Sequence, residues 1–344
     1  MRAFRRIWVP AIVFIVSCVV SLPSFFDAYR IMVFNVLPRD DYAPFLLHFC
    51  TGHGAWPGSP SGYRFLSVLP AIPLYWVLPL IKFNRMPVLD PSYLKATEAF
   101  AVLSFISIAA ATTVTFEFVR LKIRGSLSQA SFIAALTMIV AGFAGRTGIE
   151  SFSILVIFVL FCLIERSTLF SLAVLPAAFV NEKVAMFFLF LLISRAVFVP
   201  GYYSAHRWQT VTCVAASLLY AVAVITIRLP GNEYQTTVSN WVPQAIYMVR
   251  LSISSLKALD LNVIPLLVIT IPCVMFSLFS STSTQLIARS DFLVPLGLFG
   301  VSLAGTTGYT IGRIVPLALP LTAFSCAFLL REYDQPNDSL RDAA

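Results

Sequence analysis

Apolar runs separated by short polar links dominate this chain. After Lys95 they cover residues 96–119, 129–145, 151–164, 168–180, 184–199, 208–227, 263–280, 292–311 and 314–330, and a further run covers residues 7–26. Crossing a bilayer takes about 20 apolar residues, so the shorter runs predict helices that are short, tilted or broken inside the protein. The pattern predicts an all-α fold, a polytopic transmembrane helix bundle of about 10–11 spans in one domain, residues 1–344.

The first apolar run predicts a signal anchor. Arg2, Arg5 and Arg6 precede it, as in a secretory signal, and residues 15–18 loosely resemble a lipoprotein cleavage box. The run continues well past Cys18 to spanning length, which favours an uncleaved helix with a cytoplasmic N-terminus. The chain from Asp27 onward then lies outside.

Two longer polar stretches are predicted as outer loops. The first, residues 27–95, has an amphipathic segment (27–37), a turn-rich stretch (51–58) and an apolar segment (64–81) that Pro70, Pro73 and Pro79 interrupt. That apolar segment could cross the membrane, dip in and return, or lie flat. The second outer loop is residues 229–262.

Composition supports a membrane protein. The chain is 58% hydrophobic and 12% charged, whereas ordinary soluble domains are about 25% charged. The net charge of +8 is scattered between apolar runs, which excludes a basic nucleic-acid surface and is typical of charges that orient helices. Most cysteines lie within apolar stretches, so their positions predict no disulfide framework and no metal site.

Orientation depends on the segment 64–81. Basic residues divide equally between the two sides whether or not it crosses, so the positive-inside rule does not decide. We favour the non-crossing arrangement because it places the cluster Arg120, Lys122 and Arg124 inside. It also collects the following charged residues on the outer face: Asp40, Asp41, Arg64, Arg146, Glu150, Glu182, Lys183, Glu233 and Arg313.

Four sequence features follow one another along the first part of the chain. An acidic pair (Asp40-Asp41) comes after the first helix, followed by a Tyr-Arg-x-Leu-x-x-x-Pro segment (63–70), a charged link (145–150) and the pair Glu182-Lys183. In this order, over about residues 1–195, the chain resembles the GT-C superfamily of membrane glycosyltransferases. It is shorter than most members, lacks their C-terminal soluble domain, and has Glu150 where relatives often have Asp.

The resemblance implies a function and a location. Members transfer a sugar from a polyprenyl-phosphate donor to a glycan, lipid or protein acceptor on the non-cytoplasmic face, here of a bacterial inner membrane. They use an acidic residue of the first outer loop, which Asp40 or Asp41 matches. No cofactor is implied.

The residues suit that chemistry. A carboxylate such as Asp40 or Asp41 can take the proton of a sugar hydroxyl during inverting transfer, although a solvated turn explains the same pair. The leaving phosphate needs fixed cations, for which Arg64, Arg146, Lys183 and Arg313 are candidates. Arg64 and Arg313 could instead be interfacial side chains whose charged groups reach the membrane surface.

Other residues are predicted to support the site. Glu150 is a further candidate acid, and Glu182 could orient Lys183 toward phosphate, although an internal Glu182-Lys183 ion pair explains both residues. In the second outer loop, Tyr234, Asn240 and Trp241 could bind the acceptor or belong to an interfacial aromatic belt. No metal site is predicted; a divalent ion held by Asp40, Asp41 and Glu182 is the alternative.

Two other classes fit part of the pattern. A transporter or flippase for lipid-linked sugars would also need a cationic cavity, but the sequence has no internal repeat of the kind many transporters show. A polysaccharide polymerase or ligase would depend on outer arginines rather than on Asp40 or Asp41.

Overall fold

The computed structural model describes residues 8–22, 42–53, 64–78, 91–145, 150–227, 246, 250, 263–279, 285–304 and 315–334, and all regular secondary structure in them is helical. An N-terminal helix covers Trp8–Leu22. The other elements are α2 (Tyr42–Thr51), η2 (Phe65–Ser67), α3 (Ala71–Val77), α4 (Pro91–Leu121), α5 (Leu127–Gly145), α6 (Glu150–Leu163), α7 (Ser167–Ala177), α8 (Glu182–Phe198), α9 (Tyr202–Thr226), α11 (Val263–Phe279), α12 (Gln285–Ala304), η4 (Val315–Ala318) and α14 (Leu319–Asp334).

Two described helices, Ser92–Leu121 and Tyr202–Val224, are long and apolar enough to cross a membrane by length and composition. They correspond to α4 and α9. The predicted segment 64–81 contains only η2 and α3 in its described part. The seven residues of α3 extend about 10 Å, against a hydrocarbon core of about 30 Å, so α3 is too short to cross.

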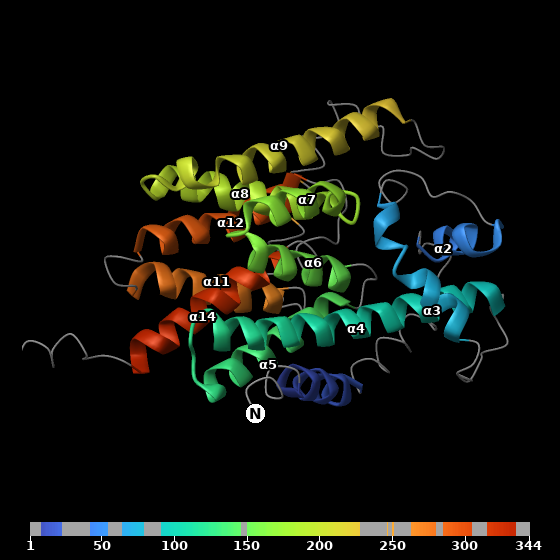
Figure 1. Cartoon of the computed structure of the whole chain (residues 1–344), viewed down its shortest axis with the longest axis horizontal. Helices are drawn as coiled ribbons and strands as arrows, with labels where there is room; N and C mark the ends of the chain where they lie inside the picture. Colours follow the sequence, from blue (N-terminus) through green and yellow to red (C-terminus); the bar gives the residue numbers. More distant parts are fainter. Residues whose placement is uncertain are drawn as a thin grey trace, which may run out of the picture.

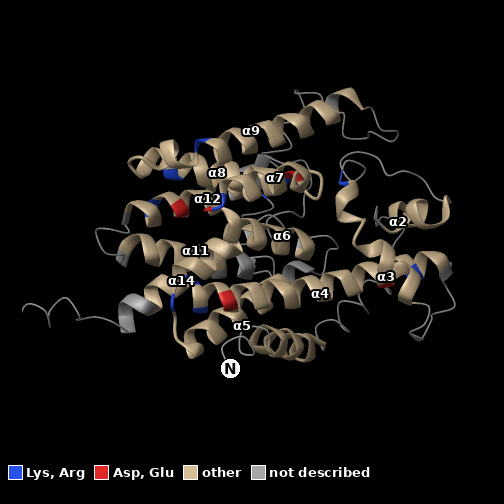
Figure 2. Cartoon of the chain, viewed as in Figure 1, with Lys and Arg blue, Asp and Glu red and all other residues tan. Residues whose placement is uncertain are grey.

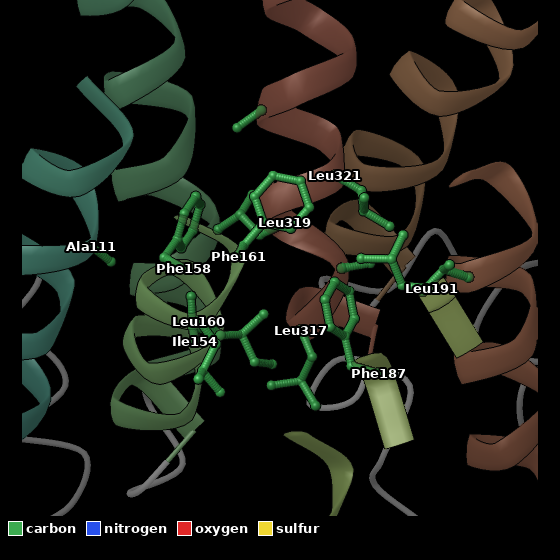
Figure 3. Close-up of a cluster of buried hydrophobic side chains, with 14 of the residues drawn as sticks. Ala111, Ile154, Phe158, Leu160, Phe161, Phe187, Leu191, Leu317, Leu319 and Leu321 are labelled. Atoms are coloured by element: carbon green, nitrogen blue, oxygen red, sulfur yellow. The ribbon is translucent and has the colours of Figure 1, made fainter. Parts of the chain in front are cut away.

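The bundle packs around one large apolar cluster. In Figure 1, α9 lies at the top above α7 and α8, helices α6, α11 and α12 lie in the middle, and α4, α5 and α14 lie below them. Phe158 and Phe161 of α6 lie on the side of Leu319 of α14, whereas Leu321 lies on the side of Phe187 and Leu191 of α8 (Figure 3). Removing these apolar side chains from water stabilises the packing of the helices.

Three buried hydroxyl groups of α4 have partners within their own helix. On α4, Ser107, Thr112 and Thr115 are buried, and each donates to the carbonyl four residues earlier at 2.7–2.8 Å. Such bonds satisfy a polar group within its own helix, so it can be buried without a partner elsewhere.

The two ends of the bundle are tied by different polar contacts. At one end, the Ser104 hydroxyl of α4 donates to Ser151 of α6, and Asn181 before α8 donates to Ser153. We call this the Arg64 end, because Arg64 lies there against α8.

At the opposite end, Gln129 of α5 donates to the Leu330 carbonyl of α14, and Gln209 of α9 donates to the Ile164 carbonyl after α6. This is the Arg124 end, named for the link between α4 and α5. In Figure 2, blue ribbon marks several Lys and Arg positions at this end of the helices, and others lie near α2 and α3.

The long helices extend past the short ones at the Arg64 end. Ser104 meets the start of α6 although it lies 13 positions after Pro91, so α4 projects about 20 Å beyond α6 at 1.5 Å per residue. Helices α2 and α3 pack on this projecting part, where Phe45, Tyr75 and Phe100 share a second apolar cluster. The starts of α6 and α8 are therefore recessed behind α2, α3 and the beginning of α4 (Figure 1).

Candidate functional site

An ion pair between Arg64 and Glu182 lies at the centre of the Arg64 end. The Arg64 Nε donates to Glu182 Oε2 at 2.7 Å, and Nη2 donates to Oε1. Arg64 is buried, and the side chain of Glu182 is only 20% exposed. A fork of two parallel bonds fixes the guanidinium in one orientation more strictly than a single contact would.

Arg64 is held by the chain around it. The Ser67 hydroxyl and the Ser67 backbone N–H both donate to the Arg64 carbonyl, at 2.6 and 3.0 Å. The neighbouring Phe65 ring packs on Phe179, with ring centroids 5.7 Å apart. These contacts dock the segment before α3 onto the link between α7 and α8.

Glu182 and Lys183 occupy the first turn of α8, where Asn181 is the N-cap. The Asn181 Oδ1 accepts a bond from the Lys183 backbone N–H at 3.2 Å, and its Nδ2 donates to Ser153 at 3.1 Å. Asn is a favoured N-cap residue because its side chain satisfies a backbone donor that the helix leaves unpaired. Asn181 therefore fixes the start of α8 against α6.

Tyr220 of α9 completes the cluster. It lies close enough to Glu182 and Arg64 to interact with both electrostatically, and its ring packs on Phe179 with centroids 5.9 Å apart. The cluster thus joins the segment before α3, the start of α8 and the last part of α9. With Arg64, Lys183 and one carboxylate, its side chains carry one net positive charge.

The site lies below the outer ends of the long helices. Tyr220 is six positions before the end of α9 at Thr226, a distance of about 9 Å along the helix. Irregular backbone such as the link 178–181 is tolerated at membrane depth only inside protein or beside a water-filled cavity. The cluster is therefore recessed from the end of α9 at Thr226.

The structure brings together three of the residues predicted for the site: Arg64, Glu182 and Lys183. Glu182 pairs with Arg64, 118 positions away. The predicted alternative paired Glu182 with its neighbour Lys183 and did not include Arg64. Glu150 opens α6 at the same end.

The other predicted site residues lie outside the described part of the chain: Asp40, Asp41, Arg146, Arg313, Tyr234, Asn240 and Trp241. Helix α2 begins directly after Asp41, and α5 ends directly before Arg146. Across the described residues, no group of three or more His, Cys, Asp and Glu side chains could hold a metal ion. The alternative site of Asp40, Asp41 and Glu182 includes two residues outside that part.

The sequence did not predict a second ion pair, between Arg195 of α8 and Asp291 of α12. The Arg195 Nε donates to Asp291 Oδ1 at 2.7 Å and Nη2 to Oδ2 at 2.8 Å, and the side chains are 9% and 1% exposed. The sequence contains one signal for this pair. Arg195 lies within one apolar run and Asp291 beside another, and charges in such places are costly unless they are paired.

Comparison of the chain with protein-family models, with curated proteins and with solved structures found no match.

Proposed function

We propose that this protein is a polytopic membrane glycosyltransferase that moves a sugar from a polyprenyl-phosphate donor to an acceptor on the non-cytoplasmic face. The observation that carries the proposal is the Arg64–Glu182 pair beside Lys183. It docks the segment that follows the acidic pair Asp40-Asp41 onto a cationic helix start. The resemblance of the sequence to the GT-C superfamily gives the reaction class.

The proposed reaction is a single displacement. Asp40 or Asp41 accepts the proton of the acceptor hydroxyl as its oxygen attacks the anomeric carbon. The bond between that carbon and the phosphate oxygen breaks, and the electron pair leaves with the polyprenyl phosphate. A positioned base contributes about 100- to 10,000-fold to such a step.

The cationic cluster acts on the leaving group. Negative charge grows on the phosphate as the glycosidic bond breaks, so a fixed cation stabilises the transition state more than the ground state. Lys183 supplies that charge from the first turn of α8. Arg64, oriented by Glu182, adds hydrogen-bond donors to this site, while its charge is balanced by the Glu182 carboxylate.

The test is sugar transfer from radiolabelled polyprenyl-phosphate sugars in membranes with matched protein levels. We expect Asp40→Asn or Asp41→Asn to lower the rate at least about 100-fold. We expect Lys183→Gln to lower the rate as well. Glu165→Gln is the matched control, because Glu165 is an exposed carboxylate at the Arg124 end.

Other outcomes point to other functions. Full transfer by both aspartate variants would exclude the proposed base. If the wild type transfers no sugar but moves lipid-linked sugar across the membrane, the protein is a flippase. Elongation of a polysaccharide that tolerates both aspartate changes would indicate a polymerase or ligase.

A further inference from the structure

The outward face of α3 is entirely apolar. Leu69, Pro73, Trp76 and Val77 recur at the spacing of one helical face and are exposed, with Leu69, Trp76 and Val77 at 41, 56 and 52%. The opposite face, Ala71, Tyr75 and Leu78, is buried in the cluster shared with α2 and α4. A surface helix in water normally has a polar outer face, so this face is unusual for a helix in contact with water.

A cation borders this face. The Lys95 Nζ lies 4.1 Å from the ring centroid of Tyr75 and 5.2 Å from that of Trp76. Lys95 directly precedes the apolar part of α4 that begins at Ala96. Lys, Tyr and Trp together are typical of the boundary between hydrocarbon and lipid headgroups.

Both flanks of α3 lie at the same end of the bundle. Ala43, Phe45 and Leu46 of α2 pack with Ala96 and Phe100, in the first turns of α4. The described helices α2 and α3 therefore lie with the beginning of α4 at one end of the bundle, and α3 is too short to reach the other end.

We propose that the outward face of α3 is a lipid-binding surface. Acyl chains of the leaflet at the Arg64 end cover Leu69, Pro73, Trp76 and Val77, and the Lys95 ammonium pairs with the phosphate of an anionic phospholipid. The absence of polar side chains on this face and the cation at its edge fit a phospholipid better than a protein partner. The proposal rests on the membrane location in the proposed function, but not on glycosyl transfer.

A spin label tests the apolar contact. In a variant with its six cysteines replaced, a nitroxide at Val77 in vesicles should collide with oxygen and not with a water-soluble nickel chelate. Thr51, which is exposed on α2, is the aqueous control. Collision with nickel at Val77 would place the face in water, and protection from both reagents would mean that protein or a second copy covers it. Either result overturns the proposal.

Tryptophan quenching tests the phosphate contact. With Trp76 as the sole tryptophan, brominated phosphatidylglycerol should quench its fluorescence more than brominated phosphatidylcholine. Lys95→Gln should abolish this preference, and Lys122→Gln, at an exposed position of the Arg124 end, should keep it. Equal quenching by both lipids before any substitution would overturn the role of Lys95. Sugar transfer measured in the same preparations separates failure of this proposal from failure of the proposed function.

Cysteine labelling tests the return of the chain. Thr51→Cys and Ser92→Cys are both at exposed positions and should react with a membrane-impermeant maleimide from the same side. Labelling from opposite sides would mean that the segment crosses, and would overturn the proposal.

Discussion

At the scale of single residues, Arg195 and Asp291 form an ion pair almost out of reach of solvent. The pair is bidentate, and Tyr202 lies beside it, with its ring centroid 5.8 Å from the Arg195 guanidinium carbon. Removing two charges from water costs several kcal/mol per ion, and mutual attraction offsets this only with good geometry. The contribution of each partner therefore depends on the other.

We expect Asp291→Ala and Arg195→Met each to destabilise the protein by about 3–5 kcal/mol, because each leaves an uncompensated buried charge. The double variant should lose less stability than the sum of the losses in the two single variants. Unfolding in detergent, followed by tryptophan fluorescence, measures all three. Glu165→Gln is the control, since Glu165 is exposed and its contact with His206 is long, at 3.8 Å, so the contact should contribute less than about 1 kcal/mol. Additive losses would contradict the coupling.

The sequence shows which residues need partners but not which partners they find. Hydropathy marks Arg64, Glu182 and Arg195 as unusual, because each lies in or beside an apolar run. Their partners are 96 and 118 positions away, and helical periodicity contains no information on pairing at that range. Glu182 was therefore assigned to its sequence neighbour Lys183, and Asp291 was not singled out.

At the scale of elements, the link between α4 and α5 reverses the chain within a few residues. Arg124 adopts a φ of 60°, and the Gly125 N–H donates to the Val119 carbonyl at 3.0 Å. The Ser126 backbone N–H then donates to Gln129 Oε1, and the Gln129 backbone N–H donates to Ser126 Oγ. This reciprocal pair is a capping box, which satisfies two backbone donors at the start of α5.

We expect Ser126→Ala to cost about 1 kcal/mol, because it removes the N-cap acceptor of α5. Ser126→Asp keeps an acceptor and should be nearly neutral. Gly125→Ala should cost about 1–3 kcal/mol by overpacking, because a Cβ there would lie 2.9 Å from Val119 Cγ1 and from Gln129 Oε1. Detergent unfolding checks these values. If Gly125→Ala leaves the free energy of unfolding unchanged, the link between α4 and α5 accommodates the added methyl group without cost.

Most element bounds followed from the apolar runs, because a helix that buries its apolar residues ends where they end. The runs at 129–145 and 263–280 match α5 and α11 closely. Helix α9 begins six positions before its run at 208, because polar residues continue the helix there despite a kink at His206. Helix α12 likewise begins at Gln285, before the run at 292.

At the scale of the whole molecule, the alternating helices give the bundle two chemically different ends. The Arg124 end includes the basic cluster Arg120, Lys122 and Arg124, whereas the Arg64 end includes the recessed ion pair and the apolar face of α3. The orientation that we favour, with this basic cluster inside, makes the Arg124 end the cytoplasmic one. The proposed reaction and the proposed lipid surface then share the outer side.

Helix α9 offers the sharpest test of this arrangement, because only a small part of its surface is buried inside the protein. Ser204 and Thr226 are exposed and 22 positions apart, which is about 33 Å along a helix and close to the hydrocarbon thickness of about 30 Å. An impermeant maleimide should label Ser204→Cys only in inverted vesicles and Thr226→Cys only in intact cells. Ser128→Cys, at the Arg124 end, should behave like Ser204→Cys. Labelling of Ser204 and Thr226 from one side would mean that α9 lies outside the bilayer, and the site beside Tyr220 would then face an aqueous substrate rather than a lipid phosphate.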